Sequence, residues 1–439
     1  MIAKGNQILR QRNFDAVVTG SGVGGMCIAA LLSCNGFRVL LAEKRRYLGG
    51  RFSTVNHNGY LCATGGLAVP VGHNMEQVCQ AIGISSGVKP ATKVATWLAG
   101  DFYDLSKGGT RTIIRQVAED EGEARRVTDA LNNAMSRKAP GHDISFKDWL
   151  DQYTHNPGIH GVFQATISSL LTVNSYELPA AEYFKVMKVI SPLTFGFIEG
   201  GSLALWERMA TLIREAGGEV WTGAAAECFK VQKGRAAGVH IRRNRQTLDI
   251  NAPIVVSNIG PAGTAALIPE GQLDPGYLEK IHTSMTPTAI MWLHFSSNEL
   301  LLDYSAISVA CSRRVNMIDV PSMQAEGIAP PGKHLYTVGA APLDSLNPGD
   351  IKQEFAEVMK DLNDIIPDFD RQCTVLTKTC YRGKWPGFRT VPGKHAGHRT
   401  PIRNLYNVGD AACPSGYEGS MGAAKSAQLV YEDIRSAGR

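Results

Sequence analysis

The sequence of 439 residues lacks the cysteine pairs and charge blocks that would assign a protein to a class at once. Its nine cysteines stand singly, with no Cys-x-x-Cys pair, so we expect neither a metal site nor a disulfide framework. An odd, dispersed set of this kind is typical of a reducing compartment and favours a cytoplasmic protein. Lysine and arginine form no long block and the formal net charge is only +5, so we expect no nucleic-acid partner.

Long apolar runs are also missing. No stretch approaches the ~18 uninterrupted apolar residues of a transmembrane helix, so none is expected, although peripheral contact with a membrane remains open. The first residues, MIAKGNQILRQRNFD, lack the apolar core of a secretion signal. A hydrophobic content of 44% and a charged content of 19% are ordinary for a globular enzyme. The length predicts roughly two or three compact units.

What the sequence does contain is a glycine-rich stretch, FDAVVTGSGVGG, at residues 14–25. A lone Gly-x-Gly-x-x-Gly pattern is weak evidence, but its surroundings predict a complete β-α-β unit. A short buried strand at 14–18 precedes the loop, and a helix of small residues follows it and ends at Gly36. A second strand at 37–41 then leads to Glu43.

Each residue of the loop has a physical task in holding a dinucleotide. Gly20 permits the tight turn out of the strand, Gly22 lets the backbone approach a pyrophosphate, and Gly25 lets helix and strand pack closely. The start of the helix, with Val23 and Gly24, presents free N–H groups and the positive end of the helix dipole to the phosphates.

Glu43, at the end of the second strand, can accept hydrogen bonds from ribose hydroxyls, which disfavours NADP. The next run, KRRYLGGRFST at 44–54, separates NAD from FAD. A plain NAD domain needs no second glycine pair. The pair Gly49-Gly50 allows the chain to pass close to a longer ligand, and Arg51 can neutralise pyrophosphate charge.

This order of glycine loop, acid and Gly-Gly-Arg resembles the flavin-binding superfamily of amine oxidases and phytoene desaturases. The resemblance implies FAD as the cofactor and adds Lys44, Arg45 and Gly50 to the expected cofactor site. It continues in HNGYLCATGGLAVP, where Gly65 and Gly66 are expected to let the backbone run beside the flavin ring.

A further segment of the nucleotide-binding type lies at 199–231. We expect a helix there that ends at Gly217, followed by a strand. The same resemblance implies a backbone contact to the adenine near Ala226. The run APIVVSNIGP at 252–261 predicts another buried strand that returns to the sheet, with Asn258 at its end as a further cofactor residue.

The second strong motif, NLYNVGDAACPSGYEGSMGAAKSAQLVYEDI, occupies residues 404–434. It predicts a strand, a loop and a helix, and it resembles the C-terminal motif of the phytoene-desaturase-like proteins. A carboxylate at the strand end can bond the ribityl or pyrophosphate part of a flavin, and the helix N-terminus can favour negative charge on the reduced ring. The cofactor residues expected here are Gly409, Asp410, Gly419, Ser420 and Met421.

Together these motifs predict an α/β fold: a Rossmann-like FAD-binding domain of the glutathione-reductase-2/amine-oxidase type with an inserted α+β substrate domain. The FAD-binding domain is expected to be discontinuous, comprising 1–69, 196–264 and 391–439. Amphipathic helices at 70–195 and alternating strand runs at 265–390 predict the substrate domain, a helical insertion plus a mixed sheet.

Candidates for the catalytic groups lie mostly near the C-terminal motif. Tyr417 and Glu418 are in the loop that is expected to reach the flavin ring, so they are the first candidates for a base that removes a proton. Trp385 is a candidate for the cavity wall. His395 and His398 precede the last strand and are expected at the surface.

The function expected is that of an FAD-dependent dehydrogenase or desaturase. It would remove a hydride and a proton from a C–C bond of a fairly apolar small molecule, of alicyclic or isoprenoid type, and pass electrons to oxygen or a quinone. One alternative is a flavin amine oxidase that acts on a C–N bond. Another is a flavin-dependent isomerase, or a non-enzymatic escort of prenylated proteins, on the same fold. The escort predicts no flavin, and the presence of Glu43, Arg51 and Asp410 argues against it.

Overall fold

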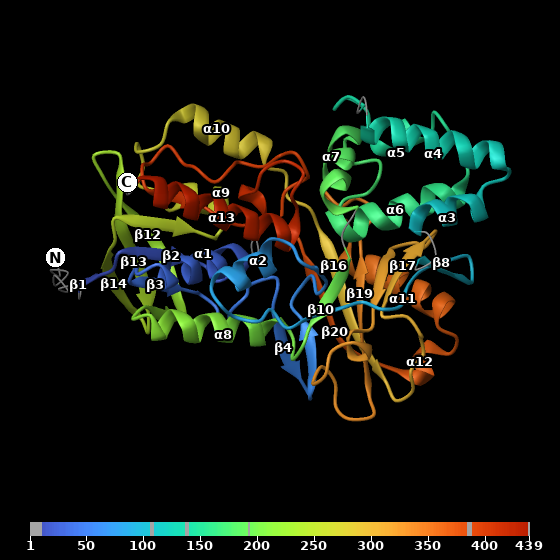
Figure 1. Ribbon diagram of the computed structural model, residues 1–439, viewed down its shortest axis with the longest axis horizontal. Helices are drawn as coiled ribbons and strands as arrows, with labels where there is room; N and C mark the ends of the chain where they lie inside the picture. Colours follow the sequence, from blue (N-terminus) through green and yellow to red (C-terminus); the bar gives the residue numbers. More distant parts are fainter. Residues whose placement is uncertain (1–10, 106–108, 137–139, 192–193, 384–388, 438–439) are drawn as a thin grey trace.

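The computed structural model describes residues 11–105, 109–136, 140–191, 194–383 and 389–437. These residues form two lobes that lie side by side (Figure 1). The colours show that the first lobe combines segments from the start, the middle and the end of the chain. Within the described ranges, no helix is both long enough and apolar enough to cross a bilayer.

The first lobe is centred on a sheet of five parallel strands. In spatial order they are β11 (Glu219–Trp221), β3 (Val39–Ala42), β2 (Ala16–Thr19), β15 (Ile254–Ser257) and β21 (Leu405–Asn407). Strands β2 and β3 are buried along their whole length, as expected for a sheet covered on both faces. The strands fall in the runs expected from the sequence, and the predicted α/β fold is confirmed.

Two long helices pack against α1 (Val23–Cys34), the helix that follows the glycine loop. Helix α1 links β2 to β3, and its small residues are buried as far as Ser33, so that α8 (Ser202–Glu215) and α13 (Gly419–Ala437) pack closely against it (Figure 1). As predicted, α1 ends before Gly36, whose φ of 84° is in the left-handed region. Val23 at the start of α1 and Gly419 at the start of α13 both line one cavity.

A four-stranded sheet flanks the parallel sheet. Its order is β1 (Gln11–Asn13), β14 (Gln246–Asn251), β13 (Arg235–Arg243) and β12 (Ala224–Gln232). Two-residue turns join β12 to β13 and β13 to β14, and both turn residues have positive φ in each case, which is the type I′ geometry of tight hairpins. The register of β12 shifts after Ala226, close to the parallel sheet.

The second lobe is built on a large mixed sheet of seven strands. Their order is β20 (Cys373–Tyr381), β16 (Ile290–Ser297), β19 (His334–Ala340), β18 (Val315–Asp319), β17 (Ala306–Ala310), β8 (Val94–Leu98) and β9 (Asp101–Asp104). Because side chains alternate between faces, Leu293 and Phe295 pack against α11 (Ile351–Ile365) on one side. Ile290 and Trp292 lie on the opposite face, which borders a cavity.

Residues 70–195, expected to be largely helical, also contribute strands. Their helices are α2 (Asn74–Ala81), α3 (Gly109–Val117), α4 (Glu121–Ser136), α5 (Phe146–Leu150), α6 (Pro157–Leu171) and α7 (Ala180–Ile190). The same segment contains β7 (Val88–Pro90), β8 and β9, and β8 pairs in parallel with β17 of the large sheet. The sequence did not reveal β9 because this strand, DFYD, is mostly exposed and shows no alternation of apolar and polar residues.

The remaining elements are short. They are α9 (Pro261–Ala266), α10 (Pro275–Ser284), α12 (Phe369–Gln372), β4 (Thr54–His57), β5 (Tyr60–Ala63), β6 (Val69–Pro70) and β10 (Phe195–Ile198). Strands β4 and β5 form a hairpin, and β10 pairs with both β6 and β7. In Figure 1, β4 and β10 lie where the two lobes meet. The β4–β5 hairpin follows the Gly49-Gly50 pair in the chain, and β5 contacts β19 of the large sheet.

Candidate functional site

A cavity of about 880 Å³ extends from the carboxyl ends of the parallel strands to the large sheet. Its volume is near the upper end of the ~300–1,000 Å³ range of ligand pockets. The expected cofactor residues that line it are Gly20, Gly22, Val23, Glu43, Lys44, Arg45, Gly50, Arg51, Gly65, Gly66, Ala226, Asn258, Gly409, Asp410, Gly419, Ser420 and Met421. Residues from the first, middle and last parts of the chain thus line the same cavity.

Two of the expected cofactor residues, Gly24 and Gly25, pack against backbone instead. A Cβ on Gly25 would lie 2.0 Å from the carbonyl oxygen of Gly20, and one on Gly24 would lie 2.7 Å from the amide nitrogen of Gly409. Both positions therefore require glycine for close packing of α1. Gly20 itself has a φ of 90°, which suits the turn out of β2.

Asn258 connects the glycine loop to the C-terminal strand. With its side-chain amide oriented to satisfy both neighbours, its oxygen accepts a hydrogen bond of 2.8 Å from the Gly22 N–H. Its nitrogen then donates to the Val408 carbonyl at 3.1 Å. The Gly22 N–H is therefore already bonded, so the free donors of this loop are the N–H groups of the first turn of α1.

Glu43 holds the glycine loop from the end of β3. Its Oε2 accepts hydrogen bonds from the N–H and Oγ of Ser21, at 2.8 and 2.7 Å. Its Oε1 accepts a bond of 2.8 Å from the Arg45 N–H. The residue is only 5% exposed but lines the cavity. Since a carboxylate has about four acceptor positions, Glu43 retains capacity for a ligand hydroxyl.

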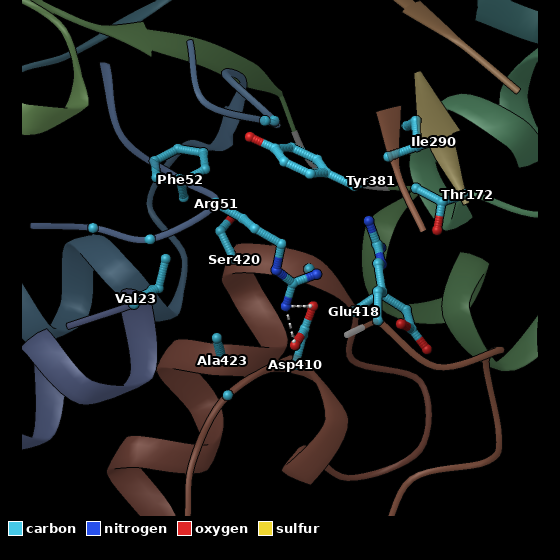
Figure 2. Close-up of a pocket in the computed structure, with 18 of the residues that line it drawn as sticks. Val23, Arg51, Phe52, Thr172, Ile290, Tyr381, Asp410, Glu418, Ser420 and Ala423 are labelled. Carbon is cyan, nitrogen blue, oxygen red and sulfur yellow. Dashed lines mark hydrogen bonds and ion pairs between the residues drawn. The ribbon is translucent and has the colours of Figure 1, made fainter. Parts of the chain in front are cut away.

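Arg51 and Asp410 form an ion pair at the cavity wall, beside the start of α13 (Figure 2). The Arg51 Nη2 donates to both carboxylate oxygens, at 2.8 and 2.9 Å. The two residues are 359 positions apart, so the pair connects the first and last segments of the lobe. Close packing continues at Gly65, where a Cβ would lie 2.2 Å from the Arg51 carbonyl oxygen.

The N-terminus of α13 faces the same cavity. Gly419, Ser420 and Met421 line it, and the first-turn amides of a helix have no partner within that helix. The strand end before this helix is fixed by the Gly409 N–H, which donates to the Ser426 Oγ at 2.9 Å. The start of α13 therefore offers hydrogen-bond donors and positive potential to a bound group.

Glu418 also lines the cavity and is paired with His395. The His395 Nε2 and the Glu418 Oε1 are 3.3 Å apart, although they are not aligned for a hydrogen bond. Burial lowers the pKa of His395, but the adjacent Glu418, with Asp410 and Glu182 farther away, outweighs it, and the net pKa is raised. The His395 side chain is 5% exposed, so the expectation that it lies at the surface is wrong.

The other catalytic candidates are placed differently. Tyr417 does not line the cavity, and its ring centroid is 6.2 Å from that of His73. Trp385 lies outside the described residues. His398 is half-buried beside Asp433, with its Nε2 3.1 Å from the carboxylate. Of the two predicted catalytic residues that the structure describes, Glu418 lines the cavity and Tyr417 does not.

Several lining residues were missed at the end of the cavity formed by the second lobe. Tyr381, whose pKa is raised to about 12 chiefly by burial, donates a hydrogen bond to the Thr64 carbonyl. Arg389 donates to the Leu170 carbonyl at 2.9 Å. Thr172 and Ile290 face the same space (Figure 2). Tyr381 and Arg389 belong to the same stretch as Trp385, YRGKWPGFRT at 381–390, but only Trp385 was predicted to line the cavity.

Comparison with known proteins is consistent with this geometry. A model of the family described as flavin containing amine oxidoreductase matches residues 23–434. An uncharacterized protein of Methanocaldococcus jannaschii is 22% identical over 430 residues, which cover 95% of this chain and 99% of that protein. An all-trans-zeta-carotene desaturase of Myxococcus xanthus is 28% identical over 290 residues, 58% of this chain. That match spans only about half, 54%, of the desaturase.

Solved structures share the fold. An oxidoreductase of Methanosarcina mazei superposes with a TM-score of 0.84 at 24% identity, over 96% of this chain and 100% of the other. A putrescine oxidase, bound to putrescine, gives a TM-score of 0.71 at 15% identity, over 97% and 100% of the two chains. The predicted resemblance to amine oxidases and phytoene desaturases is thus confirmed, as is the fold class.

Proposed function

The chain belongs to the flavin-containing amine oxidoreductase family, and from this premise we propose that it is an FAD-dependent dehydrogenase or desaturase of a fairly apolar small molecule. The observation that carries the proposal is one cavity that joins the glycine loop to an apolar chamber on the large sheet. The segments 1–69, 196–264 and 391–439 would bind the cofactor. The segments 70–195 and 265–390 would bind the substrate.

The groups at the cofactor end fit FAD. The start of α1 supplies N–H donors for a pyrophosphate, and the buried Glu43 supplies acceptors for ribose hydroxyls. Arg51 and Asp410 supply a paired cation and acceptor farther along the cavity, and the start of α13 supplies donors for the ring edge. A flavin bound here supplies the two-electron acceptor of the reaction.

Glu418 is the group that we propose as the proton acceptor. It lines the cavity, and its carboxylate lies 3.3 Å from the buried His395 Nε2, whose pKa is raised although burial alone would lower it. The oxidation would break two C–H bonds of the substrate, one as a hydride and one as a proton that Glu418 takes up. The start of α13 would stabilise negative charge beside the chamber.

The chamber favours apolar substrates because Ile290, Trp292 and Phe195 contribute to its wall. The names of two relatives, the zeta-carotene desaturase and an all-trans-retinol 13,14-reductase, refer to isoprenoid molecules. We therefore propose an isoprenoid or alicyclic substrate, with oxygen or a quinone as the final electron acceptor.

The test is spectroscopic. The purified protein is expected to show flavin absorbance that releases FAD on denaturation, and to bleach anaerobically with a substrate from a panel of polyenes and cyclic hydrocarbons. A protein that remains colourless after reconstitution with FAD would exclude the proposal.

An amine oxidase acting on a C–N bond is the second candidate, and the fold of putrescine oxidase favours it. Anaerobic bleaching by amines but not by hydrocarbons, with ammonia and hydrogen peroxide released in air, would select this candidate over the desaturase. The same panel therefore distinguishes the two.

A further inference from the structure

The wall of the apolar chamber contains a carboxyl group without a partner. Asp319, the last residue of β18, lines the cavity and is 3% exposed. Its Oδ2 is buried and has no hydrogen-bond partner among the residues that the structure describes. Buried polar groups are almost always hydrogen-bonded, so an unpaired carboxyl at a cavity wall points to a missing ligand atom or water.

A second unpartnered group lies on the same wall. Ser308 of β17 also lines the cavity, and its buried Oγ has no hydrogen-bond partner within the described part of the chain. Asp319 is directly opposite Ala306, and Ser308 is two residues farther along β17. Side chains two residues apart on a strand share a face, so Asp319 and Ser308 are diagonal neighbours, with Cα atoms about 7–8 Å apart.

Further polar groups continue the row across the sheet. Thr337 of β19 is opposite Asp319, and His294 of β16 is opposite Thr337, so all three project from the same face. The Oγ1 of Thr337 and the Nε2 of His294 are buried and unpartnered in the described ranges, whereas the His294 Nδ1 is 2.7 Å from the Thr377 Oγ1. Among the described lining residues of the cavity are Asp319 and Ser308 but not Thr337 or His294, so these two are the polar groups of the row that a ligand can reach.

Apart from this row of polar groups, the cavity-lining residues beside the carboxyl are apolar. Ala306, Met317 and Val94 line the same end of the cavity. Burial raises the pKa of Asp319 to about 7, and no neighbouring charge offsets it. A donor supplied by a ligand would replace the hydrogen bonds that the chain does not provide.

We propose that Asp319 and Ser308 form a subsite that binds a hydrogen-bond donor, a hydroxyl or a protonated amine, at one end of an otherwise apolar substrate. This inference rests on the proposed function only in identifying the ligand of the chamber as the substrate. The subsite would fix the orientation of that molecule, because its polar end would bind the large sheet and its apolar part would extend toward the cofactor end.

Binding of a matched series of probes to the purified protein, as isolated, tests the proposal. The probes are n-octylamine, 1-octanol and 1-methoxyoctane, which share an alkyl chain and differ in the donor group. Dissociation constants are measured by calorimetry under anaerobic conditions. We expect the amine, the alcohol or both to bind about 10- to 100-fold more tightly than the ether, which accepts but does not donate. A preference for the amine alone identifies an ammonium site, a preference for the alcohol alone identifies a hydroxyl site, and equal preference shows that the subsite accepts either donor.

Two substitutions at Asp319 and one control assign the selectivity. Asp319→Leu should reduce the preference over the ether to less than about 2-fold, and Asp319→Asn should reduce the preference for the amine over the alcohol. Asp303→Asn, an equal charge change at an exposed side chain of the same lobe, should change neither. Circular dichroism verifies that each variant is folded. If the native protein binds the ether as tightly as the donors, or if Asp319→Leu retains the selectivity, the subsite does not exist.

The binding assay is independent of turnover and of the flavin spectrum. Donor selectivity in a protein that holds no FAD would support the subsite and contradict the proposed function. A flavin-containing protein that oxidises a hydrocarbon, and whose probe selectivity is unchanged by the Asp319 substitutions, would support the proposed function and contradict the subsite.

Discussion

Replacing Asp319 by asparagine should make the stability of the protein less dependent on pH. Burial raises the pKa of Asp319 to about 7, compared with the ~3.9 of an unfolded aspartate. The folded state therefore retains a proton that the unfolded state has lost between these two values. The stabilising contribution is fully present below about pH 4 and is lost as pH rises through about 7.

The magnitude follows from the difference between the two pKa values. A gap of about three pKa units corresponds to about 4 kcal/mol lost above neutrality, and the part that falls between pH 5 and pH 8 is about 2–3 kcal/mol. Because asparagine cannot ionise, Asp319→Asn should gain stability relative to the native protein by that amount over this range.

Paired denaturant titrations at pH 5 and pH 8 measure this difference. The native protein and Asp319→Asn are compared at each pH, so that contributions from other titrating groups cancel. Asp303→Asn serves as the control, since its side chain is 69% exposed and should show no such change. A constant stability difference between the native protein and Asp319→Asn at both pH values would refute the reasoning, because it would mean that the carboxyl ionises as it does in water.

Three further outcomes test the cofactor end of the cavity. Gly25→Val should lose more than about 90% of the flavin absorbance per protein, because the added Cβ would lie 2.0 Å from a carbonyl oxygen that α1 packs against. Glu43→Ala should weaken flavin retention in dialysis at least about 10-fold, whereas Ser21→Ala, which keeps the carboxylate, should not; equal retention in both would contradict the ribose assignment. His395→Gln should remove one ionisation from the kcat/KM profile, at a pH above the usual range of histidine, since burial lowers the pKa of His395 but the adjacent Glu418 raises it overall; an unchanged profile would show that the pair is only structural.

The cofactor end could be predicted from the sequence because its chemistry is local. A turn, a helix start and an acid within about 30 residues are enough to specify a dinucleotide cradle. Contacts between residues far apart in the sequence nevertheless altered two of the expectations for this end of the cavity. The Gly22 N–H is bonded to the Asn258 side chain, and His395 is buried beside Glu418 instead of exposed. Neither contact has a pattern in the sequence, because each partner comes from a different strand or loop.

The large sheet was only partly predictable. The runs that became β16, β17, β19 and β20 were recognised from their apolar alternation, but β18 was not. Its sequence, VNMID, includes two polar residues, Asn316 and Asp319, and both are buried. A polar residue in a short run normally indicates a solvent-facing position or a turn, so the pattern gave no reason to expect a central strand of a buried sheet.

The missed strand explains why the sequence identifies the cofactor better than the substrate. In the proposed cofactor site, backbone N–H groups would make many of the contacts, and the glycines that permit their approach leave a recognisable sequence pattern. At the substrate end, Asp319 and Ser308 become neighbours only through the pairing of β17 with β18. Asp319 lies on the large sheet and belongs neither to the glycine loop nor to the first turn of α1 or α13, so a substitution there leaves those elements unchanged. On the proposed assignment, substrate preference could therefore change by substitutions on the large sheet while the loops proposed to bind the cofactor remain intact.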